Sequence, residues 1–515
     1  MTDIEQSDIE QADIEQVDGR PNILLVMADQ LAAPFLPAYG GPAITPAIDR
    51  LAAEGVVFES AYSNSPLCAP ARFAMMAGRL NSKIGAYDNA SEFASSIPTF
   101  AHYLRSAGYQ TSLIGKMHFV GADQLHGFED RLTTDIYPAD FGWTPDWADP
   151  EGRFDWWFHN MDSVVNAGVA EASNQLDYDD DVGYQAVRKL RDLARTSDTR
   201  PWFVTVSFTH PHDPYVARRE FWDRYDHDAI PMPNVGPLPD ADLDPHSRRL
   251  SHVISSDVTT VSDEQIRNAR HAYLANTSYV DDFVADLMAT LDRLDMRKNT
   301  VVLFTADHGD MLGERGLWYK MNYFEHSARI PMIISAPGRL GPGRVSTPTS
   351  LLDIAPTLLD LARAEIPDTL DGDSLLSVAG NGPDPDRTVL GEYLGEGAIA
   401  PIFMIRRGDH KFVWCEVDPP QLYDLAADPH ELVNLATRPE HGATVAAFET
   451  ELLSLWDPPA INAQVLASQR ARTEVDQALR QGRFEAWDYQ PTTDARNQYM
   501  RNHLDLNQVE STRRI

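Results

Sequence analysis

The chain has 515 residues, of which 43% are hydrophobic, and 77 acidic side chains against 43 basic ones give it a formal charge of −34. This composition excludes a disordered chain, and the length suits one large α/β domain with smaller appendages. The negative surplus repels phosphate backbones and anionic lipids, so neither nucleic acid nor a membrane surface is an expected partner. Two cysteines, Cys68 and Cys415, are too few for a disulfide framework, which suits a reducing compartment.

The first 18 residues carry three copies of Asp-Ile-Glu-Gln at a spacing of five residues. That period fits neither a helix face nor a strand, so we predict a disordered acidic tail over residues 1–18. The tail has neither the basic start nor the apolar centre of a signal peptide, and no later stretch is apolar over the length that a bilayer requires. We therefore expect the protein to be cytoplasmic.

Four short apolar runs, each followed by ionisable side chains, are predicted to be buried strands. They cover residues 22–28, 109–115, 202–208 and 300–305. Helical patterns lie between them, which predicts an α/β fold with a large, mostly parallel sheet flanked by helices. Because ligands bind beyond the carboxyl ends of parallel strands, we expect the polar residues at those ends to form one site. These residues are Asp29, Gln30, Lys116, His118, His210, His212, Asp307 and His308.

From residue 386 onward the pattern changes to that of a small antiparallel sheet followed by a turn and a helix. We therefore divide the chain into the acidic tail, a catalytic α/β domain over 19–385, a C-terminal α+β subdomain over 386–457 and a tail over 458–515. The last segment is polar, with scattered aromatic residues and little core-forming periodicity. It must pack on its own body or, as we expect, on a neighbouring subunit.

The sharpest local signal is the sequence CAPAR at residues 68–72. The pattern Cys-x-Pro-x-Arg is the one by which sulfatases have their cysteine oxidised to formylglycine. In the alternative interpretation Cys68 is a buried, inert thiol beside the start of a helix. The other motifs of the chain decide between the two.

The motif occurs together with NILLVMADQ, GKMH, ADHGD and LYDLAADPHELVNLA, along nearly the whole chain past the acidic tail. In these motifs the chain resembles a sulfatase of the alkaline-phosphatase superfamily. Longer stretches, such as VSFTHPHDPY and DHGDMLGERGLWYKMN, are similar to the choline-sulfatase branch. The resemblance implies a sulfatase-like fold with a smaller C-terminal antiparallel subdomain, and hydrolysis of a sulfate ester, in particular choline-O-sulfate. It also implies a formylglycine nucleophile, made from Cys68 by formylglycine-generating machinery.

A metal site is expected at the strand ends. Two carboxylates and an amide oxygen, on Asp29, Asp307 and Gln30, are hard ligands suited to a divalent cation, and His308 lies beside them. The resemblance implies Ca²⁺, with the modified Cys68 as a further ligand. Many sulfatases have Asn in place of His308 and Asp in place of Gln30, so an imidazole in the shell leaves Mg²⁺ and Mn²⁺ open. In the alternative interpretation the two aspartates only cap the helices that follow their strands.

Fixed cations stabilise the spread negative charge of a sulfate group in a dry site. We expect four basic residues around that group: Arg72, Lys116, His118 and Lys320. His118 lies two residues from Lys116, so on an extended backbone both side chains point the same way. The role of Lys320 is predicted mainly from the resemblance. In the implied mechanism Asp307 deprotonates the attacking hydroxyl of hydrated formylglycine, and His118 deprotonates the second hydroxyl.

His210 and His212 are both candidates for protonating the leaving alkoxide. In the wider family the histidine that precedes an x-Pro pair in this motif is the active one, which favours His212. Either residue could instead be a structural histidine, and Asp213 is expected to shape the turn. An alkoxide is a poor leaving group, so help from a general acid matters more than it would for an aryl sulfate.

The substrate cation has its own candidate residues. A quaternary ammonium group cannot donate hydrogen bonds and is held by aromatic faces and carboxylates. A cluster with such faces comprises Trp143, Trp147, Trp156, Trp157 and His159. The resemblance selects Trp143 and His159, with Glu392 as the counter-charge and Asp505 of the tail as a contribution from a neighbouring subunit. For any single tryptophan the alternative is packing in the core.

Two other functions stay open. One is a phosphonate monoester or phosphodiester hydrolase of the same superfamily, which uses the same nucleophile and differs in its preference among esters. The other is an osmolyte-binding protein without catalysis, in which Cys68 stays a thiol. A homo-oligomer is also expected, because the aromatic residues of the tail suggest exchange between subunits, but dimer and tetramer look alike from the sequence.

Overall fold

The computed structural model describes residues 19–153, 159–484, 487–492 and 504–514. Its largest sheet has eight strands in the order β12-β2-β11-β9-β1-β7-β4-β5. Four central strands run parallel: β9 (Thr300–Ala306), β1 (Asn22–Asp29), β7 (Trp202–Pro211) and β4 (Gln110–Gly115). They are the four strands that the sequence predicts, so the mostly parallel α/β sheet is confirmed. The outer strands are short: β2 (Val56–Phe58), β5 (Asp130–Arg131), β11 (Met332–Ser335) and β12 (Gly343–Val345).

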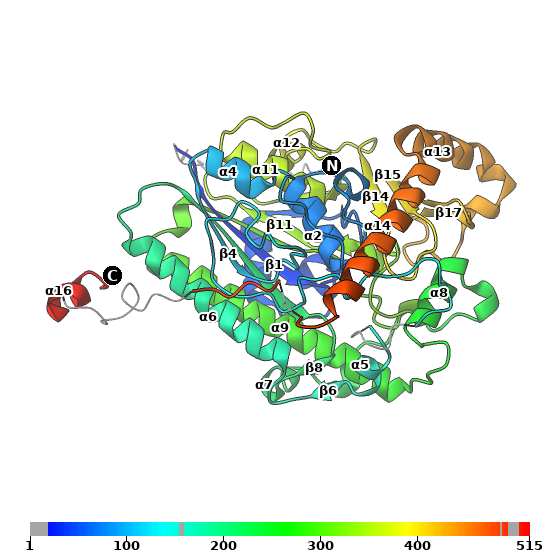
Figure 1. Ribbon diagram of the computed structural model, residues 1–515, viewed down its shortest axis with the longest axis horizontal. Helices are drawn as coiled ribbons and strands as arrows, with labels where there is room; N and C mark the ends of the chain where they lie inside the picture. The colour runs from blue at the N-terminus through cyan, green and yellow to red at the C-terminus, as the bar shows by residue number, and fades with distance from the viewer. Residues whose placement is uncertain (1–18, 154–158, 485–486, 493–503, 515) are drawn as a thin grey trace, which may run out of the picture.

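Helices cover both faces of this sheet (Figure 1). One face carries the long helices α6 (Asn174–Arg195) and α9 (Asp263–Arg293). The other carries α2 (Cys68–Ala77), α4 (Phe100–Ser106) and α11 (Ile354–Leu361). Because both faces of the sheet are covered, the central strands have no side toward solvent. Their sequences are therefore continuously apolar instead of alternating between apolar and polar residues.

Short elements connect these layers. The helices among them are α1 (Pro46–Glu54), α3 (Asn81–Ile84), α5 (Asp162–Val165), α7 (Arg219–Trp222), α8 (Pro245–Val253), α10 (Glu325–Ala328) and α12 (Leu375–Gly380). The strands form two small sheets, made of β3 (Ala61–Tyr62), β10 (Arg329–Ile330) and β13 (Thr349–Ser350), and of β6 (Gly168–Val169) and β8 (Val216–Ala217).

A separate four-stranded antiparallel sheet follows in the chain, as predicted for the C-terminal part. Its strands are β14 (Thr388–Tyr393), β15 (Ile402–Arg407), β16 (His410–Cys415) and β17 (Asp418–Asp424). Lys411 of β16 is completely buried and reaches Glu325 at 2.9 Å and Glu431 at 2.6 Å. A buried ammonium group needs such partners, so this ion triad ties the small sheet to α10 of the catalytic part.

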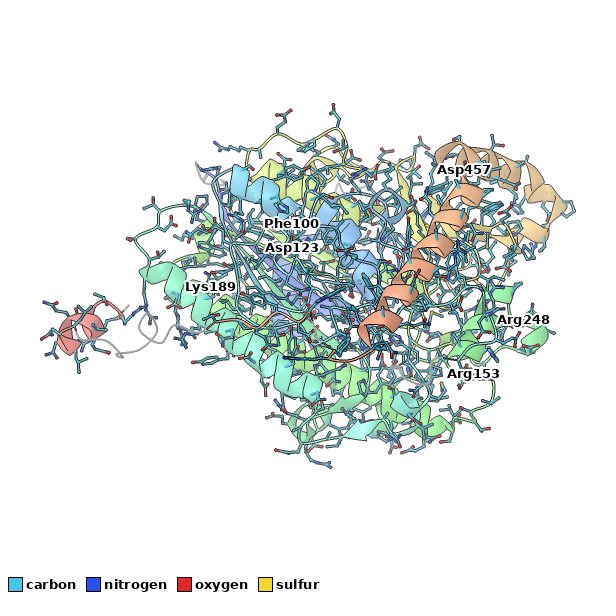
Figure 2. All side chains as sticks on the ribbon, viewed as in Figure 1. Phe100, Asp123, Arg153, Lys189, Arg248 and Asp457 are labelled. Carbon is cyan, nitrogen blue, oxygen red and sulfur yellow. The ribbon has the colours of Figure 1, made fainter. Side chains whose placement is uncertain are left out.

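Two helices complete the C-terminal part, α13 (Gly442–Leu455) and α14 (Pro458–Leu479). Asp457, labelled in Figure 2, caps α14 by accepting a hydrogen bond from the Ala460 amide. Arg472 of α14 donates two hydrogen bonds of 2.6 Å to the carboxylate of Asp88, which is buried in the catalytic part. Thus α14, the first part of the predicted tail over 458–515, packs on its own subunit.

The rest of that tail is described in part. Helix α16 (Leu506–Ser511) stands apart from the other elements at the left of Figure 1. The predicted acidic tail over 1–18 lies outside the described residues, as do Trp156 and Trp157. Among the described residues no helix has the length and apolarity needed to cross a membrane.

Candidate active site

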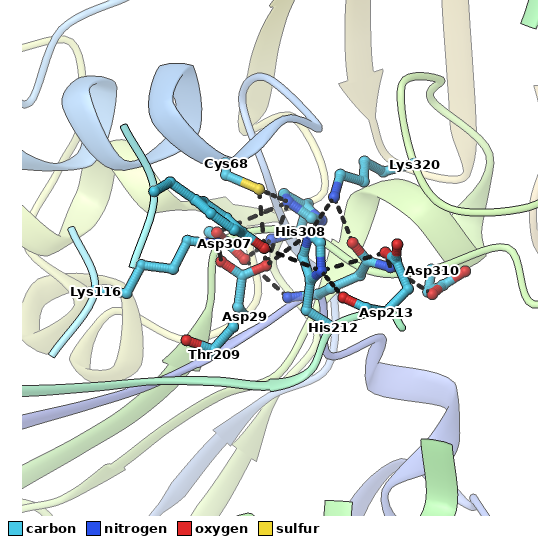
Figure 3. Close-up of polar contacts among 12 residues, drawn as sticks. Asp29, Cys68, Lys116, Thr209, His212, Asp213, Asp307, His308, Asp310 and Lys320 are labelled. Carbon is cyan, nitrogen blue, oxygen red and sulfur yellow. Dashed lines mark hydrogen bonds and ion pairs between the residues drawn. The ribbon is translucent and has the colours of Figure 1, made fainter. Parts of the chain in front are cut away.

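The polar residues that follow the central strands meet at one edge of the sheet. Asp29 ends β1, Asp307 and His308 follow β9, and Lys116 follows β4. All four side chains are buried and point toward one another (Figure 3). Parallel strands bring their carboxyl ends to the same edge, so the site that the sequence predicts there is confirmed as a cluster.

Cys68 is the first residue of α2 and lies at the centre of this cluster. Its Sγ is 3.2 Å from Nε2 of His308 and 3.7 Å from Oδ1 of Asp29. Burial raises the pKa of the Cys68 thiol to about 12, and the charge of Asp29 adds to the effect. The thiol is therefore protonated at neutral pH and is a poor nucleophile as it stands. A nucleophile at this position requires modification of the cysteine.

Arg72 lies one turn after Cys68 on α2. Its guanidinium donates at 2.8 Å to Asp307 and at 2.8 Å to Asp29, and its remaining contacts are the backbone oxygen of Lys116 and the hydroxyl of Ser207. Every nitrogen of the group is thus engaged within the protein. Arg72 holds the two carboxylates in position, whereas the sequence expectation places it around the sulfate.

Four residues offer donor atoms for a metal ion. The ligand atoms of Asp29, Cys68, Asp307 and His308 all lie within 4.8 Å of one another. Nδ1 of His308 faces the Gly309 oxygen at 3.0 Å, so Nδ1 carries the proton and Nε2 keeps its lone pair toward the other three. Two carboxylates with a neutral imidazole fit a divalent cation.

Gln30, a predicted metal ligand, is engaged in hydrogen bonds through both ends of its side-chain amide. Its side-chain oxygen accepts a hydrogen bond from Lys320. Its amide nitrogen donates to Asp310 at 2.6 Å and to Asp213 at 3.2 Å. Gln30 therefore links Lys320 to two buried carboxylates, and its backbone amide donates to Asp307 at 3.0 Å.

The charges of the cluster balance in its interior. Burial alone would raise the pKa of Asp29, but the charges of Lys116 and Arg72 hold it well below its usual range. Nζ of Lys116 lies 2.5 Å from Oδ2 of Asp29. Burial raises the pKa of Asp213 to about 7, helped by Asp310 and opposed by Lys320. The centre is thus a buried array of paired charges. An additional charge there interacts strongly with its neighbours, because little solvent screens it.

Lys320 connects two histidines of the site. Its Nζ lies 2.7 Å from Nε2 of His159 and 2.9 Å from Nε2 of His212. Nδ1 of His212 faces the Asp213 oxygen at 2.6 Å, so His212 accepts from Lys320 at its other nitrogen. Burial, together with the charge of Lys320, lowers the pKa of both histidines well below the usual value. Both are neutral in this state.

His210 is turned away from this array. Its Nδ1 lies 2.7 Å from the carboxylate of Asp179 on α6, which also accepts from the His210 amide. Its ring packs edge-on against Tyr279 of α9. Of the two competing histidines, only His212 lies beside Lys320 and within 3.9 Å of Asp29.

His118 lies beside Lys116 with its ring enclosed. Neither of its ring nitrogens has a hydrogen-bond partner among the described residues. Burial, together with the charge of Lys116, lowers the pKa of His118 to about 3. The backbone φ of +60° is a left-handed conformation that non-glycine residues rarely adopt. Such an imidazole has nitrogens available for a hydrogen bond from a bound group.

Aromatic rings stand beside the histidines. Trp143 packs edge-on against His118 at 5.8 Å between ring centroids, and Tyr137 lies 5.2 Å from Trp143 and 5.9 Å from His212. Tyr137 also lies under the ammonium group of Lys116, 4.2 Å from it. Trp147, by contrast, is buried and donates to the Gly395 oxygen, which is a packing role. Tyr137 is not predicted from the sequence, because nothing in its local sequence marks a tyrosine as a ring partner.

The two glutamates of GEYLGEG differ in their environments. Both oxygens of Glu392 are occupied, by the amide and hydroxyl of Ser82 and by the indole of Trp456. Glu396, four residues later, is also buried, but its Oε2 has no partner within the described part of the chain. Burial, together with the charge of Asp88, raises the pKa of Glu396 to about 8. Glu396 is thus the acidic residue that the sequence analysis passed over.

Asp505 lies outside the site of its own subunit. It is exposed and caps α16 by accepting from the Gln508 amide. Figure 1 shows α16 at the far side of the molecule from α14. A role for Asp505 in catalysis would therefore need a second copy of the chain.

A parallel sheet with a cysteine, two paired carboxylates and a cluster of lysines and histidines at its carboxyl edge defines a hydrolase site for a charged ester. Residues 21–364 match the family model described as sulfatase. The chain belongs to the sulfatase family, in its choline-sulfatase branch. Two further models match its C-terminal part: N-sulphoglucosamine sulphohydrolase, C-terminal, over 313–457, and choline sulfatase enzyme C terminal, over 463–515.

Relatives of known name agree with this assignment. The chain is 51% identical to a choline-sulfatase of Rhizobium meliloti (strain 1021), over 96% of this chain and 98% of that protein. It is 28% identical to arylsulfatase K of Canis lupus familiaris, over 87% of this chain and 84% of the relative. Among solved structures, the phosphonate monoester hydrolase of Agrobacterium radiobacter superposes with a TM-score of 0.69 at 24% identity, covering 87% of this chain and 96% of its own. At that identity the likeness concerns the fold.

Proposed function

We propose that this protein hydrolyses choline-O-sulfate to choline and sulfate. The observation that carries the proposal is the pairing of two features at one strand edge. One is the Cys68 cluster with its lysines, and the other is the set of aromatic rings beside it, with Glu396, whose Oε2 has no partner among the described residues, near enough for the charge of Lys320 to affect its pKa. The first suits a sulfate ester and the second suits a quaternary ammonium group. The 51% identity to a protein named choline-sulfatase supports the same assignment.

Residue 68, Asp29, Asp307 and His308 would hold the metal ion, which we propose to be Ca²⁺, with Mg²⁺ and Mn²⁺ tested beside it. Membership of the sulfatase family implies a metal and a formylglycine at residue 68. When present, the hydrated formylglycine supplies the attacking hydroxyl and the metal offsets negative charge at the sulfate. Every other step falls to side chains of this chain.

Asp307 is the proposed acceptor of the proton of the attacking hydroxyl. Its Oδ2 is held by Nε of Arg72 at 2.8 Å, and its Oδ1 accepts from the Gln30 and His308 amides. These contacts fix the carboxylate relative to Cys68. Arg72 is therefore a positioning residue, while the ammonium groups of Lys116 and Lys320 supply the positive charge that stabilises the sulfate.

His212 is the proposed proton donor to the leaving oxygen. Its Nε2 accepts a hydrogen bond of 2.9 Å from the Lys320 ammonium, so the proton that His212 passes to the leaving oxygen is supplied by Lys320. The negative charge of a bound sulfate raises the proton affinity of this pair. His118, neutral and without hydrogen-bond partners at its ring nitrogens, is the proposed base for the second proton transfer.

The substrate cation would lie against Trp143 and His159, with Glu396 as its counter-charge in place of Glu392. Glu392 is already satisfied by Ser82 and Trp456, so it has no free oxygen for a cation. Glu396 has one free oxygen and lies close enough for the charge of Lys320 to affect its pKa. A cation beside it would stabilise its ionised form.

We also propose a homo-oligomer in which the tail after α14 reaches a neighbouring subunit and brings Asp505 to its site. The supporting feature is the exposed position of Asp505, on a helix that lies far from α14 in Figure 1. Dimer and tetramer are distinguished by native mass measurement. Both cysteines are buried free thiols, which supports a cytoplasmic location.

The test of the activity is kcat/KM for choline-O-sulfate, an uncharged alkyl sulfate of similar size and a phosphonate monoester, with Cys68→Ala as the blank. The ratios report differences in transition-state binding. We expect choline-O-sulfate to be preferred and the preference to fall when Trp143 is changed to Ala. If the phosphonate monoester is the better substrate, the nucleophile stands and the proposed substrate is wrong.

A further inference from the structure

A cavity lies away from the active-site cluster, at the junction of the large α/β part and the small antiparallel sheet. Its volume is about 600 Å³. Its walls come from the loop before α1, from α9, α10 and β15, and from the loops around residues 231–234 and 425–430. None of the lysines or histidines of the active-site cluster lines it. Junctions of this kind are common places for small-molecule sites.

The cavity is rich in arginine, although the protein as a whole is strongly acidic. Arg270, Arg329 and Arg406 line it, against the two carboxylates of Glu325 and Asp409. Glu325 is paired at 2.9 Å with Lys411, an ammonium group that it shares with Glu431, and Arg270 lies 3.6 Å from Glu314. The side chains that line the cavity thus carry three arginine charges against two carboxylate charges, in a chain with a formal charge of −34.

Each of the three arginines uses only part of its guanidinium within the protein. Arg270 donates through Nε and Nη1 to the backbone oxygens of Pro231 and Leu312. Arg406 donates through Nε to the Tyr62 hydroxyl and through Nη1 to backbone oxygens.

Arg329 donates only through Nε, to the Glu59 oxygen at 2.9 Å. Within the described part of the chain no acceptor takes Nη2 of Arg270 or Arg406, or either Nη of Arg329. Three guanidinium groups that are anchored by some nitrogens and free at others form a preorganised set of donors for oxyanions.

The rest of the wall limits the kind of ligand. Prolines and apolar side chains occupy much of it: Pro34, Phe35, Pro42, Met232, Leu425 and Pro429. The volume exceeds what a single inorganic oxyanion needs, and Phe35 is covered by the Arg270 guanidinium at 5.3 Å, so its ring face is taken. These features favour an organic frame with more than one anionic group.

We propose that this cavity is a second ligand site, which binds a small organic oligoanion through the free ends of Arg270, Arg329 and Arg406. The shared chemistry of the ligand is two or more carboxylate or phosphate groups on a compact carbon frame. Citrate and fructose 1,6-bisphosphate represent the two sources of such groups. The site is independent of the proposed sulfatase reaction, because it shares no residue with it.

The test is isothermal titration of the full-length protein with citrate, with fructose 1,6-bisphosphate and with inorganic sulfate. The variant Arg329→Gln removes the half-buried arginine with the most free nitrogens. Arg344→Gln is its matched control. Arg344 forms an ion pair with Glu59, its side chain is 51% exposed and it does not line the cavity. Loss of one charge-assisted pair corresponds to a roughly tenfold weaker Kd. We expect that loss in Arg329→Gln and wild-type affinity in Arg344→Gln.

A second variant keeps all three charges and fills the space. Asn234→Trp places a large ring at the mouth of the cavity and is expected to abolish binding, with choline-O-sulfate turnover unchanged. Binding of citrate alone identifies a carboxylate ligand, and binding of the bisphosphate alone identifies a phosphate ester. The proposal is overturned if neither organic anion binds in the millimolar range. It is also overturned if inorganic sulfate binds as tightly as they do, or if the three variants and the wild type bind alike.

Discussion

At the scale of single residues, the free oxygen of Glu396 is the feature with the clearest consequence. A buried carboxylate without a partner is costly, and a cation that fits beside it recovers that cost. Glu392, four residues earlier, is equally buried but fully hydrogen-bonded. The two glutamates therefore separate a role in substrate binding from a role in stability.

We predict that Glu396→Gln raises KM for choline-O-sulfate by about tenfold or more, in line with the loss of one charge pair, while kcat/KM for an uncharged alkyl sulfate changes little. Steady-state kinetics with both substrates measure this. Glu392→Gln is the matched control, which should lower the melting temperature and leave the substrate preference intact. If Glu392→Gln loses the preference for choline-O-sulfate and Glu396→Gln keeps it, then Glu392 is the counter-charge of the substrate cation.

A pH dependence follows from the same carboxyl group. With a pKa of about 8, Glu396 is protonated below pH 8 in the empty site and gains its charge above it. The ratio of kcat/KM for choline-O-sulfate to that for the uncharged alkyl sulfate should therefore fall about threefold from pH 8 to pH 7, if the neutral form is about tenfold weaker. Using the ratio cancels titrations that both substrates share. In Glu396→Gln the ratio should be flat over this range, and a persisting slope would assign the titration to another group.

At the scale of helices and strands, α14 is fastened to the catalytic part by one ion pair. Arg472 and Asp88 are both buried and share two hydrogen bonds of 2.6 Å. Gln469, one turn earlier, accepts from the backbone of Trp147, next to the loop that carries Trp143. The helix therefore supports the wall of the proposed cation pocket from behind.

We predict that Arg472→Met destabilises the protein by about 3 kcal/mol, because it leaves the Asp88 carboxylate buried without its partner. Chemical unfolding measures this loss. The double variant Arg472→Met with Asp88→Asn should regain most of it, since no unpaired charge is left. Arg480→Met, on the same segment with an exposed pair to Asp476, serves as control and should cost less than about 1 kcal/mol. Equal losses for Arg472 and Arg480 would contradict the fastening role of α14.

The sequence predicts the elements and the strand-end cluster well, because burial on both faces leaves a clear apolar pattern and parallel strands share one carboxyl edge. It could not predict how side chains divide their hydrogen bonds. Arg72 lies one turn from Cys68 as the motif requires, yet its nitrogens all bind Asp29, Asp307 and neighbouring oxygens. Likewise nothing local distinguishes Glu392 from Glu396, since their difference comes from Ser82 and Trp456, far away in the chain.

At the scale of the whole molecule, the acidic surface and the basic active site oppose each other. The formal charge of −34 creates a long-range field that repels anions, whereas Lys116 and Lys320 act only at short distance inside the protein. Choline-O-sulfate carries one positive and one negative group and has no net charge. An alkyl sulfate without the ammonium group is an anion and must approach against the field.

We predict that kcat/KM for an anionic alkyl sulfate rises as salt increases from low to physiological ionic strength, because the Debye length shrinks to about 8 Å and the surface repulsion is screened. For choline-O-sulfate the same change should alter kcat/KM by less than about twofold, since a zwitterion feels no net force from the distant charges. Measuring both substrates across one salt series, with the protein concentration held constant, tests this directly. If kcat/KM rises equally for both substrates, salt acts on the active site itself. If kcat/KM falls for the alkyl sulfate, the buried lysines attract the substrate more strongly than the acidic surface repels it.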